Sequence, residues 1–194
     1  MNPDSIGSGV TVMRSTCPLC NRELLTKWCP AEIPFFGEVM NITSQCDCGF
    51  RYSDTLILTQ REPVRYELTV KNPEDINARV VRSTSGTIRI PELGVDIEPG
   101  PASEAFISNI EGVLCRVRDM LETIVRWNED GKKERALELL DMIEKIIAGE
   151  AEVTVIIEDP MGNSAIISDN AVSRELTMEE ASCLKTGMIV FEPD

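Results

Sequence analysis

Residues 17–49 of this 194-residue chain read CPLCNRELLTKWCPAEIPFFGEVMNITSQCDCG, and they contain two close pairs of cysteines. Cys17 and Cys20 enclose two residues, Cys46 and Cys48 enclose one, and 25 residues separate the pairs. In a chain that shows no export signal, close cysteine pairs indicate metal binding before disulfide formation. Two pairs brought together by antiparallel strands supply the four thiolates of a closed, tetrahedral zinc site. We therefore expect a zinc ribbon with one structural Zn²⁺ bound by these four cysteines.

The residues beside the pairs suit sharply bent turns. Asn21 follows the first pair and Gly49 follows the second, and both residue types tolerate the positive φ that such turns need. Three alternatives stay open at this point. Iron could occupy the four thiolates, Cys29 could replace one member of the second pair, and Cys17 with Cys20 could form a redox dithiol. The first lacks a redox-partner motif and the last lacks a thioredoxin-like βαβ pattern.

Two further cysteines lie in the C-terminal part of the chain. Cys115 falls on the apolar stripe of a predicted helix, and Cys183 falls in an apolar segment. Both are expected to be buried core thiols.

The composition argues against an enzyme. The chain contains no histidine, which removes the commonest general base near neutral pH and the usual ligand of catalytic zinc. No Gly-rich phosphate loop and no nucleophile–histidine pairing is present. A catalytic metal in the β-rich part would have to rely on carboxylates alone, which is uncommon for such chemistry. We expect a binding protein.

The charge is −14 at pH 7, and it is unevenly distributed. Residues 1–65 carry six Lys and Arg against seven Asp and Glu, whereas residues 66–194 carry 13 against 26. Nucleic-acid binders usually present a concentrated basic surface, which this chain lacks. An acidic C-terminal part suits either a basic protein surface or solubility alone. No apolar run approaches the roughly 20 residues that cross a bilayer, and the N-terminus lacks signal-peptide features, so a cytoplasmic location is expected.

The pattern along the chain predicts an α+β protein. Residues 1–13 are expected to be a flexible tail, 14–62 the zinc ribbon with a strand at 56–59, and 63–194 a β-rich domain. Alternating apolar and polar residues predict strands at 64–70, 79–83 and within 86–99, where Pro91 and Pro99 restrict pairing. For residues 83–86 a hairpin turn is favoured over a flexible contact loop.

Helical periodicity replaces this alternation between residues 103 and 148. Apolar residues at helical spacing predict a helix over 103–127 with Ser103 as N-cap, a turn at 128–131, and a second helix over 132–148. Together they form an inserted helical hairpin. Strands at 153–159, 164–168 and 187–192 and a short helix at 177–185 complete the expected domain.

Three segments resemble one protein family. These are CPLC, EIPFFGEVMNITSQCDCGFRYSDT and RVVRSTSGTIRIPELGVDIEPGPASEAFISNIEGVL, which span roughly residues 14–121 in order. They resemble the ZPR-type zinc-finger proteins, whose best-known eukaryotic members bind translation elongation factor one-alpha. Those members carry the zinc finger and its partner domain twice, whereas this chain carries one copy, as archaeal relatives do.

The resemblance implies a zinc ribbon followed by a domain of the double-stranded β-helix type with a helical hairpin. It also implies association with the elongation factor that delivers aminoacyl-tRNA, as a partner or folding helper. The metal-ligand roles carry over to Cys17, Cys20, Cys46 and Cys48. One departure is the second pair, which encloses one residue here and two in well-known members; this leaves its turn geometry at Asp47 open.

A protein-binding function requires exposed apolar anchors with a polar rim. The candidates are Phe35, Phe36, Arg51 and Arg82; paired aromatics such as Phe35 and Phe36 are more often packed than exposed, and an arginine on a strand is more often a surface charge. The alternative function is a nucleic-acid-binding zinc ribbon in transcription or tRNA handling, which the charge distribution disfavours.

Overall fold

The computed structural model describes residues 9–127 and 132–187, and the chain divides into two compact units at the boundary between Gln60 and Arg61. We call residues 9–60 the ribbon unit and the described residues from 61 onward the second unit. The predicted turn at 128–131 lies outside the described residues, as does the predicted last strand, 187–192, apart from Gly187.

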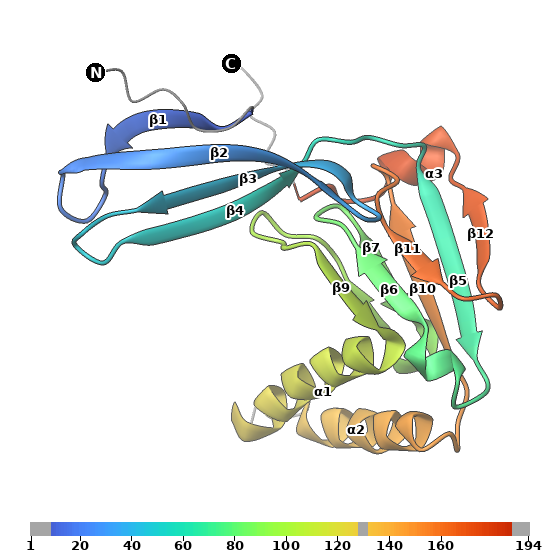
Figure 1. Ribbon diagram of the computed structural model, residues 1–194. Coiled ribbons are helices and arrows are strands. Elements are labelled where there is room, and N and C mark those ends of the chain that lie inside the picture. The colour runs from blue at the N-terminus through green and yellow to red at the C-terminus, as the bar shows by residue number, and fades with distance from the viewer. Residues whose placement is uncertain (1–8, 128–131, 188–194) are drawn as a thin grey trace. The chain divides into compact units, whose positions relative to one another are not determined.

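The ribbon unit is a four-stranded antiparallel sheet in which each strand pairs with the next along the chain (Figure 1). β2 and β3 form a long hairpin whose pairing runs from Leu25↔Gln45 to Ile33↔Gly37. Phe35, at the hairpin tip, has φ 75°. The four strands are β1 (Thr11–Thr16), β2 (Glu23–Ile33), β3 (Gly37–Gln45) and β4 (Arg51–Ile57).

Two boundaries of the ribbon strands differ from the prediction. β1 begins at Thr11, inside the expected tail, because its backbone pairs with β2 from Thr11↔Trp28 to Thr16↔Glu23. The strand expected at 56–59 begins earlier, at Arg51, because β4 pairs with β3 directly after the second cysteine pair. In both places the strand is fixed by a neighbouring strand, which the local sequence pattern does not reveal.

The second unit contains a five-stranded sheet of order β12-β5-β10-β7-β8 and a three-stranded sheet of order β11-β6-β9. All strand pairs in both sheets are antiparallel. The strands are β5 (Val64–Val70), β6 (Arg79–Arg82), β7 (Thr87–Ile90), β8 (Val95–Ile97), β9 (Phe106–Asn109), β10 (Val153–Asp159), β11 (Ala165–Ile167) and β12 (Val172–Glu175).

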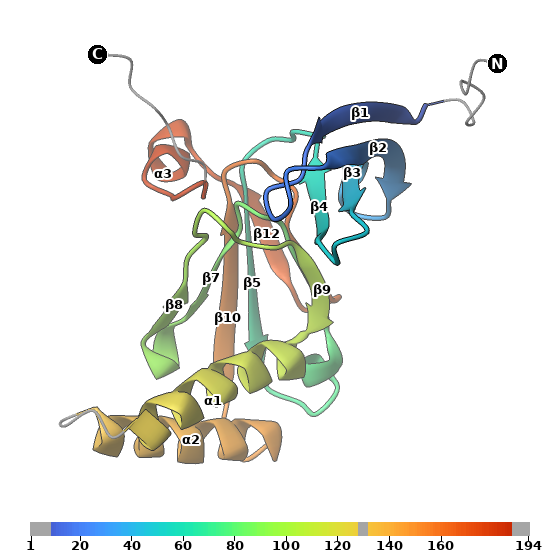
Figure 2. The same cartoon turned by 90° about the vertical axis from the view of Figure 1, so that its left-hand side faces the viewer.

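A helical hairpin is inserted between β9 and β10, and Figures 1 and 2 both show it at one end of the strands of this unit. The predicted α+β class with an inserted helical hairpin is thus confirmed. The helices are α1 (Ile110–Trp127), α2 (Lys133–Ile147) and the short α3 (Met178–Ser182), with 3-10 turns η1 (Asp75–Asn77) and η2 (Pro91–Leu93).

One apolar core joins the two sheets of the second unit to the hairpin. Its central side chains come from alternate positions of the strands and from one face of each helix, as amphipathic elements require. Because burial of a Leu or Ile side chain contributes about 1.5–3 kcal/mol, this cluster is the main source of stability in the unit. The fully buried members include Leu68, Val80, Ile88, Ile90, Leu93, Ile110, Leu114, Ile143, Ile146, Val155 and Ile157.

The start of the first helix was predicted wrongly. Residues 106–109 form strand β9, which pairs with β6, so α1 begins at Ile110 rather than at Ser103. Asn109 takes the capping role, because its side-chain oxygen accepts a hydrogen bond from the N–H of Gly112 at 2.8 Å. Ser103 instead accepts one from the N–H of Gly100 at 2.9 Å. Phe106 suited the helical spacing, but tertiary pairing with β6 overrode it.

The strand pattern over 86–99 is interrupted at Pro91. η2 begins there and reverses the chain between β7 and β8, with Gly94 in the left-handed region at φ 62°. β12 was not predicted; its four residues are exposed, so it carries no apolar alternation. It forms the edge of the sheet by pairing with β5.

We expect Gly162→Ala to lower the free energy of unfolding of the second unit by about 2–4 kcal/mol. Gly162 has φ 70° in the turn after β10, and a Cβ atom there would collide with the main chain of Arg61 and Glu62. Gly94→Ala is the matched control, because Gly94 has φ 62° but no atom within 4 Å of an added Cβ; it should cost only about 1 kcal/mol. Urea unfolding of both zinc-loaded variants measures the difference, and equal losses would contradict the steric argument.

Candidate metal centre

The four cysteines lie in the two turns at one end of the ribbon sheet. Cys17 and Cys20 are in the turn between β1 and β2, and Cys46 and Cys48 are in the turn between β3 and β4. Because both turns close at the same end of an antiparallel sheet, the hairpin register brings the two pairs together. The strand order therefore explains why the four cysteines predicted to share a metal ion lie together.

Each turn is held by main-chain hydrogen bonds. The N–H of Cys17 donates to the carbonyl of Arg22 at 2.8 Å, and the N–H of Cys46 donates to the carbonyl of Phe50 at 2.9 Å. Asn21 has φ 57° and Gly49 has φ 97°, as expected from their places after the two pairs. The single residue between Cys46 and Cys48 therefore still allows a closed turn.

The four sulfur atoms fit one tetrahedral metal ion. They lie within 4.8 Å of one another, and the Cys17–Cys48 and Cys20–Cys46 Sγ distances are both 3.6 Å. Zinc–sulfur bonds of about 2.3 Å in a tetrahedron require sulfur separations of about 3.8 Å. Cys17 and Cys46 are buried beside Leu24, with Phe50 packed against the cluster. Four thiolates complete the coordination of zinc, so the site is suited to structural metal rather than to catalysis at an open position.

Before metal binds, the surroundings of Cys20 and Cys48 shift the pKa values of these two thiols in opposite directions. Hydrogen bonds from the main chain and the guanidinium of Arg22 lower the pKa of Cys20 to about 6. For Cys48 the main-chain hydrogen bond of Phe50 also acts to lower the pKa, but desolvation and the neighbouring thiols outweigh it and raise the pKa to about 12. A divalent cation deprotonates bound thiols outright, because its charge stabilises all four thiolates together.

The other cysteines lie outside this cluster. Cys29 sits within β2, where it pairs with Asn41 of β3, so it does not replace a member of the second pair. Cys115 is half-buried and Cys183 is exposed, so the prediction of two buried core thiols is wrong for Cys183. Cys183 follows the short helix α3, none of whose residues is buried.

The four residues predicted to contact a partner have different environments. Arg51 is exposed, Phe35 is half-buried and Phe36 is 6% exposed. Arg82 is 4% exposed, so its expected role as an exposed anchor is not supported. Its guanidinium donates to the carbonyl of Gly86 at 2.8 Å and lies 5.8 Å from the ring centre of Phe106, which holds the side chain inside the second unit.

A buried polar cluster next to Arg82 was not foreseen from the sequence. Asp159, fully buried at the end of β10, accepts hydrogen bonds at 2.7 Å from the hydroxyls of Ser83, Ser85 and Ser164. It also accepts from the N–H groups of Met161 and Asn163. Residues 83–86 form a turn in which the Gly86 N–H donates to the Ser83 carbonyl, but it is not the predicted hairpin turn, because the strands that it joins, β6 and β7, lie in different sheets. The cluster joins that turn to the turn after β10; the only sequence signal was the density of serines before Gly86.

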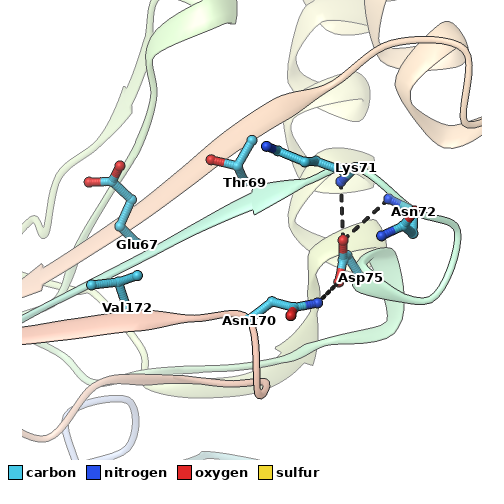
Figure 3. A pocket seen from close by; sticks show the side chains of 7 residues that line it. All are labelled: Glu67, Thr69, Lys71, Asn72, Asp75, Asn170 and Val172. Carbon is cyan, nitrogen blue, oxygen red and sulfur yellow. Dashed lines mark hydrogen bonds between the residues drawn. The ribbon is translucent and has the colours of Figure 1, made fainter.

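A polar cavity of about 350 Å³ lies over β5 and β12 of the second unit (Figure 3). Its one nearly buried carboxylate, Asp75, accepts hydrogen bonds from the N–H groups of Lys71 and Asn72 and from the Asn170 side chain. These hydrogen bonds lower the pKa of Asp75, the Asn170 amide being the largest cause. Because these three donors already satisfy the Asp75 carboxylate, its burial in the cavity is explained by its role in holding the local loop.

The ribbon sheet has one face with large exposed apolar side chains. Strand register places Trp28 opposite Ile42, Met40 opposite Leu56 and Thr26 opposite Met13, so all of them share one face with Tyr52. Met13, Tyr52 and Leu56 are 54%, 47% and 43% exposed. We call this set the apolar face: Met13, Trp28, Met40, Ile42, Tyr52 and Leu56. The other face carries Arg14, Lys27, Thr43, Gln45 and Arg51 around Leu25, together with the apolar side chains of Val12, Val39 and Ile57.

Comparison with known proteins matches both units. A family model described as the ZPR1 zinc-finger domain matches residues 9–55, and one described as the ZPR1 jelly-roll domain matches residues 74–186. The jelly roll is the double-stranded β-helix architecture that the sequence resemblance implied. No helix of the described residues is long and apolar enough to cross a membrane.

Relatives occur in archaea and eukaryotes. A ZPR1-like protein of Methanocaldococcus jannaschii is 44% identical over 186 residues, covering 93% of both chains. A ZPR1-like protein of Pyrococcus horikoshii is 47% identical over 92% of this chain and 83% of its own length. A protein of Schizosaccharomyces pombe named zinc finger chaperone zpr1 is 29% identical over 80% of this chain, which spans 35% of that protein.

Proposed function

This chain belongs to the ZPR1 zinc-finger family, and from that membership we propose that it is a zinc-stabilised protein-interaction module that binds, or assists the folding of, the translation elongation factor that delivers aminoacyl-tRNA. The zinc is structural in this proposal. The ribbon supplies a rigid sheet, and the chemistry of the interaction lies in the side chains that this sheet presents.

The observation that carries the proposal is the apolar face. Met13, Tyr52 and Leu56 are roughly half exposed on a sheet of only four strands, with Trp28 and Met40 half-buried beside them. Contiguous apolar surface with aromatic side chains is typical of protein-binding sites, where burial of such anchors supplies most of the affinity. Asp54 of the edge strand β4 lies on the same face, and it and the polar residues at the strand ends form a polar rim around the apolar side chains.

The choice of partner rests on two supports outside the geometry. The IPFF and RIPEL segments resemble those of family members that bind elongation factor one-alpha, and the S. pombe relative carries the name chaperone. The charge of −14 disfavours a nucleic-acid partner, because phosphate binding draws its affinity from Lys and Arg.

The proposal is tested with the purified elongation factor of the one-alpha type from the source organism. Binding of the zinc-loaded chain is measured by biolayer interferometry with the factor nucleotide-free, with GDP and with GTP. We expect binding in at least one state and its loss after zinc removal. Absence of binding in every state refutes the elongation-factor partner, and binding to tRNA that weakens steeply with salt favours the nucleic-acid alternative.

We expect Leu56→Asp to weaken partner binding at least tenfold, since a charge in a desolvated interface core costs more than about 1.4 kcal/mol. Leu25→Asp is the matched control: Leu25 is 45% exposed, close to the 43% of Leu56, but lies on the opposite face among Arg14, Gln45 and Arg51. Equal weakening by both variants would show that the apolar face is not the contact surface.

A further inference from the structure

The charged side chains of the ribbon sheet are segregated between its two faces. Strand register places Glu32, Glu38 and Asp54 on the side of the apolar face, and all three are exposed. None of the paired strand residues on that side is basic. The basic residues of the four strands all lie on the opposite side: Arg14, Lys27 and Arg51. The apolar face therefore has a rim of one sign of charge.

Two of these carboxylates are direct cross-strand neighbours. Register pairs Glu32 with Glu38 near the tip of the β2–β3 hairpin. Like charges directly opposite each other destabilise an antiparallel pair of strands. Among the residues that the structure describes, neither carboxylate is relieved by an ion pair. Because this pairing weakens the sheet locally, it favours a role in binding over a role in folding.

The third carboxylate lies within the apolar face itself. Asp54 is between Tyr52 and Leu56 on β4, and all three side chains point to the same side. One Asp54 oxygen accepts a hydrogen bond from the Tyr52 hydroxyl at 3.0 Å, and the other accepts one from the N–H of Thr55 at 2.8 Å. These bonds orient the carboxylate, yet no basic side chain of the described ranges pairs with it. An oriented carboxylate loses little conformational freedom when it binds a cation.

We propose that the occupant of the apolar face is a basic amphipathic segment of a protein partner. Its apolar side chains would cover Leu56, Tyr52 and their neighbours, and its Lys or Arg side chains would pair with Asp54 and with the two opposed glutamates. The inference rests on the proposed function, because it takes this face as the protein-binding surface.

Charge complementarity selects this occupant over the others. An acidic apolar segment would bring like charges against the rim, which costs affinity and excludes wrong partners. A second copy of this chain that used the same face would oppose Asp54 and the glutamates to their own equivalents, since a two-fold interface brings identical patches together. A basic segment alone supplies both apolar contact and counter-charge.

The test uses two synthetic amphipathic peptides of equal length. One has Leu at helical spacing with Lys at the flanking positions, and the other has Glu in place of every Lys. Binding to the full zinc-loaded chain is measured by fluorescence polarisation at physiological ionic strength. We expect the Lys peptide to bind about tenfold more tightly than the Glu peptide, or more. Equal affinities would overturn the proposal.

Charge reversal locates the preference on the chain. Glu38→Lys combined with Asp54→Lys should abolish the preference for the Lys peptide. The matched control is Glu74→Lys combined with Glu152→Lys, which changes the net charge equally at exposed positions of the second unit and should retain the preference. Equal losses from the two double variants would show attraction to the overall negative charge and would overturn the proposal.

A stability measurement separates binding from folding. Glu38→Lys places opposite charges across the strand pair with Glu32, so it should raise the urea midpoint of ribbon unfolding while it weakens binding of the Lys peptide. A lowered midpoint would overturn the role assigned to the two opposed glutamates.

The same variants are then measured against the elongation factor. Factor binding that is insensitive to the Glu38 and Asp54 reversals would overturn this inference and leave the proposed function standing. Absence of factor binding in every nucleotide state, together with an intact peptide preference, would refute the elongation-factor partner and support the assigned chemistry of the face.

Discussion

Cys17→Ser should abolish zinc binding and unfold the ribbon unit while the second unit stays folded. Cys17 is fully buried, and the cluster around it comprises only Leu24 and Cys46 with Cys20 and Phe50 at its margin. So small a core cannot order the turns alone, and in zinc modules the metal-binding free energy, about 10–16 kcal/mol, serves as folding free energy. The second unit has its own core and does not depend on the metal.

Native mass spectrometry measures this directly, with one zinc per wild-type chain and none in the variant. Amide hydrogen exchange should then rise over residues 11–57 and stay unchanged over β10. Cys29→Ser is the control, because Cys29 lies within β2 outside the sulfur cluster, and it should retain the metal. Retention of one zinc by Cys17→Ser, or loss of zinc without faster exchange in the ribbon, would contradict the structural role of the site.

Asp159→Ala should lower the free energy of unfolding of the second unit by about 3–5 kcal/mol. The carboxylate is fully buried and accepts hydrogen bonds from three serine hydroxyls and two main-chain N–H groups. Its removal leaves these donors without an acceptor. It also removes a negative charge that favours the charged form of the buried Arg82 guanidinium. Desolvation lowers the pKa of Arg82, and Asp159 only partly offsets this effect.

Urea unfolding of the zinc-loaded chain measures the loss, followed by hydrogen exchange over β6 and β10. Asp159→Asn keeps the shape but not the charge, so it should fall between the wild type and Asp159→Ala. Asp96→Ala is the control, since the Asp96 side chain is 54% exposed in its ion pair with Arg89 and should cost less than about 1 kcal/mol. A loss from Asp159→Ala as small as that of Asp96→Ala would refute a stabilising role for the cluster.

The metal ligands could be predicted from the sequence because cysteine spacing encodes the turn that holds them. Asn21 and Gly49 occupy the left-handed backbone positions that those turns require, so the turn geometry could be predicted from neighbouring residues. The helical hairpin could also be predicted, from the 3.6-residue periodicity of its apolar residues. The start of α1 could not be predicted, because the apolar residue Phe106 fits the spacing of a helix and also fits a strand that pairs with β6.

The partner-contact residues show the limit of this reasoning. Arg82 lies in a strand of alternating character, and only its contacts with Gly86 and with the more distant Phe106 reveal that it points inward. The apolar face is equally invisible in the sequence, because its members come from four strands and share a side only through their register. A shift of one residue in any pairing would have moved them to the opposite face.

The sequence by itself therefore determined the four-thiolate site, the turns that carry it and the hairpin of helices, since each depends on residues close together in the chain. Only the tertiary structure decided where β9 replaces helix, that Asp159 gathers three serines, and which side chains make the apolar face. These features depend on pairings between distant segments. Their free energies are set by burial and register, which no local pattern specifies.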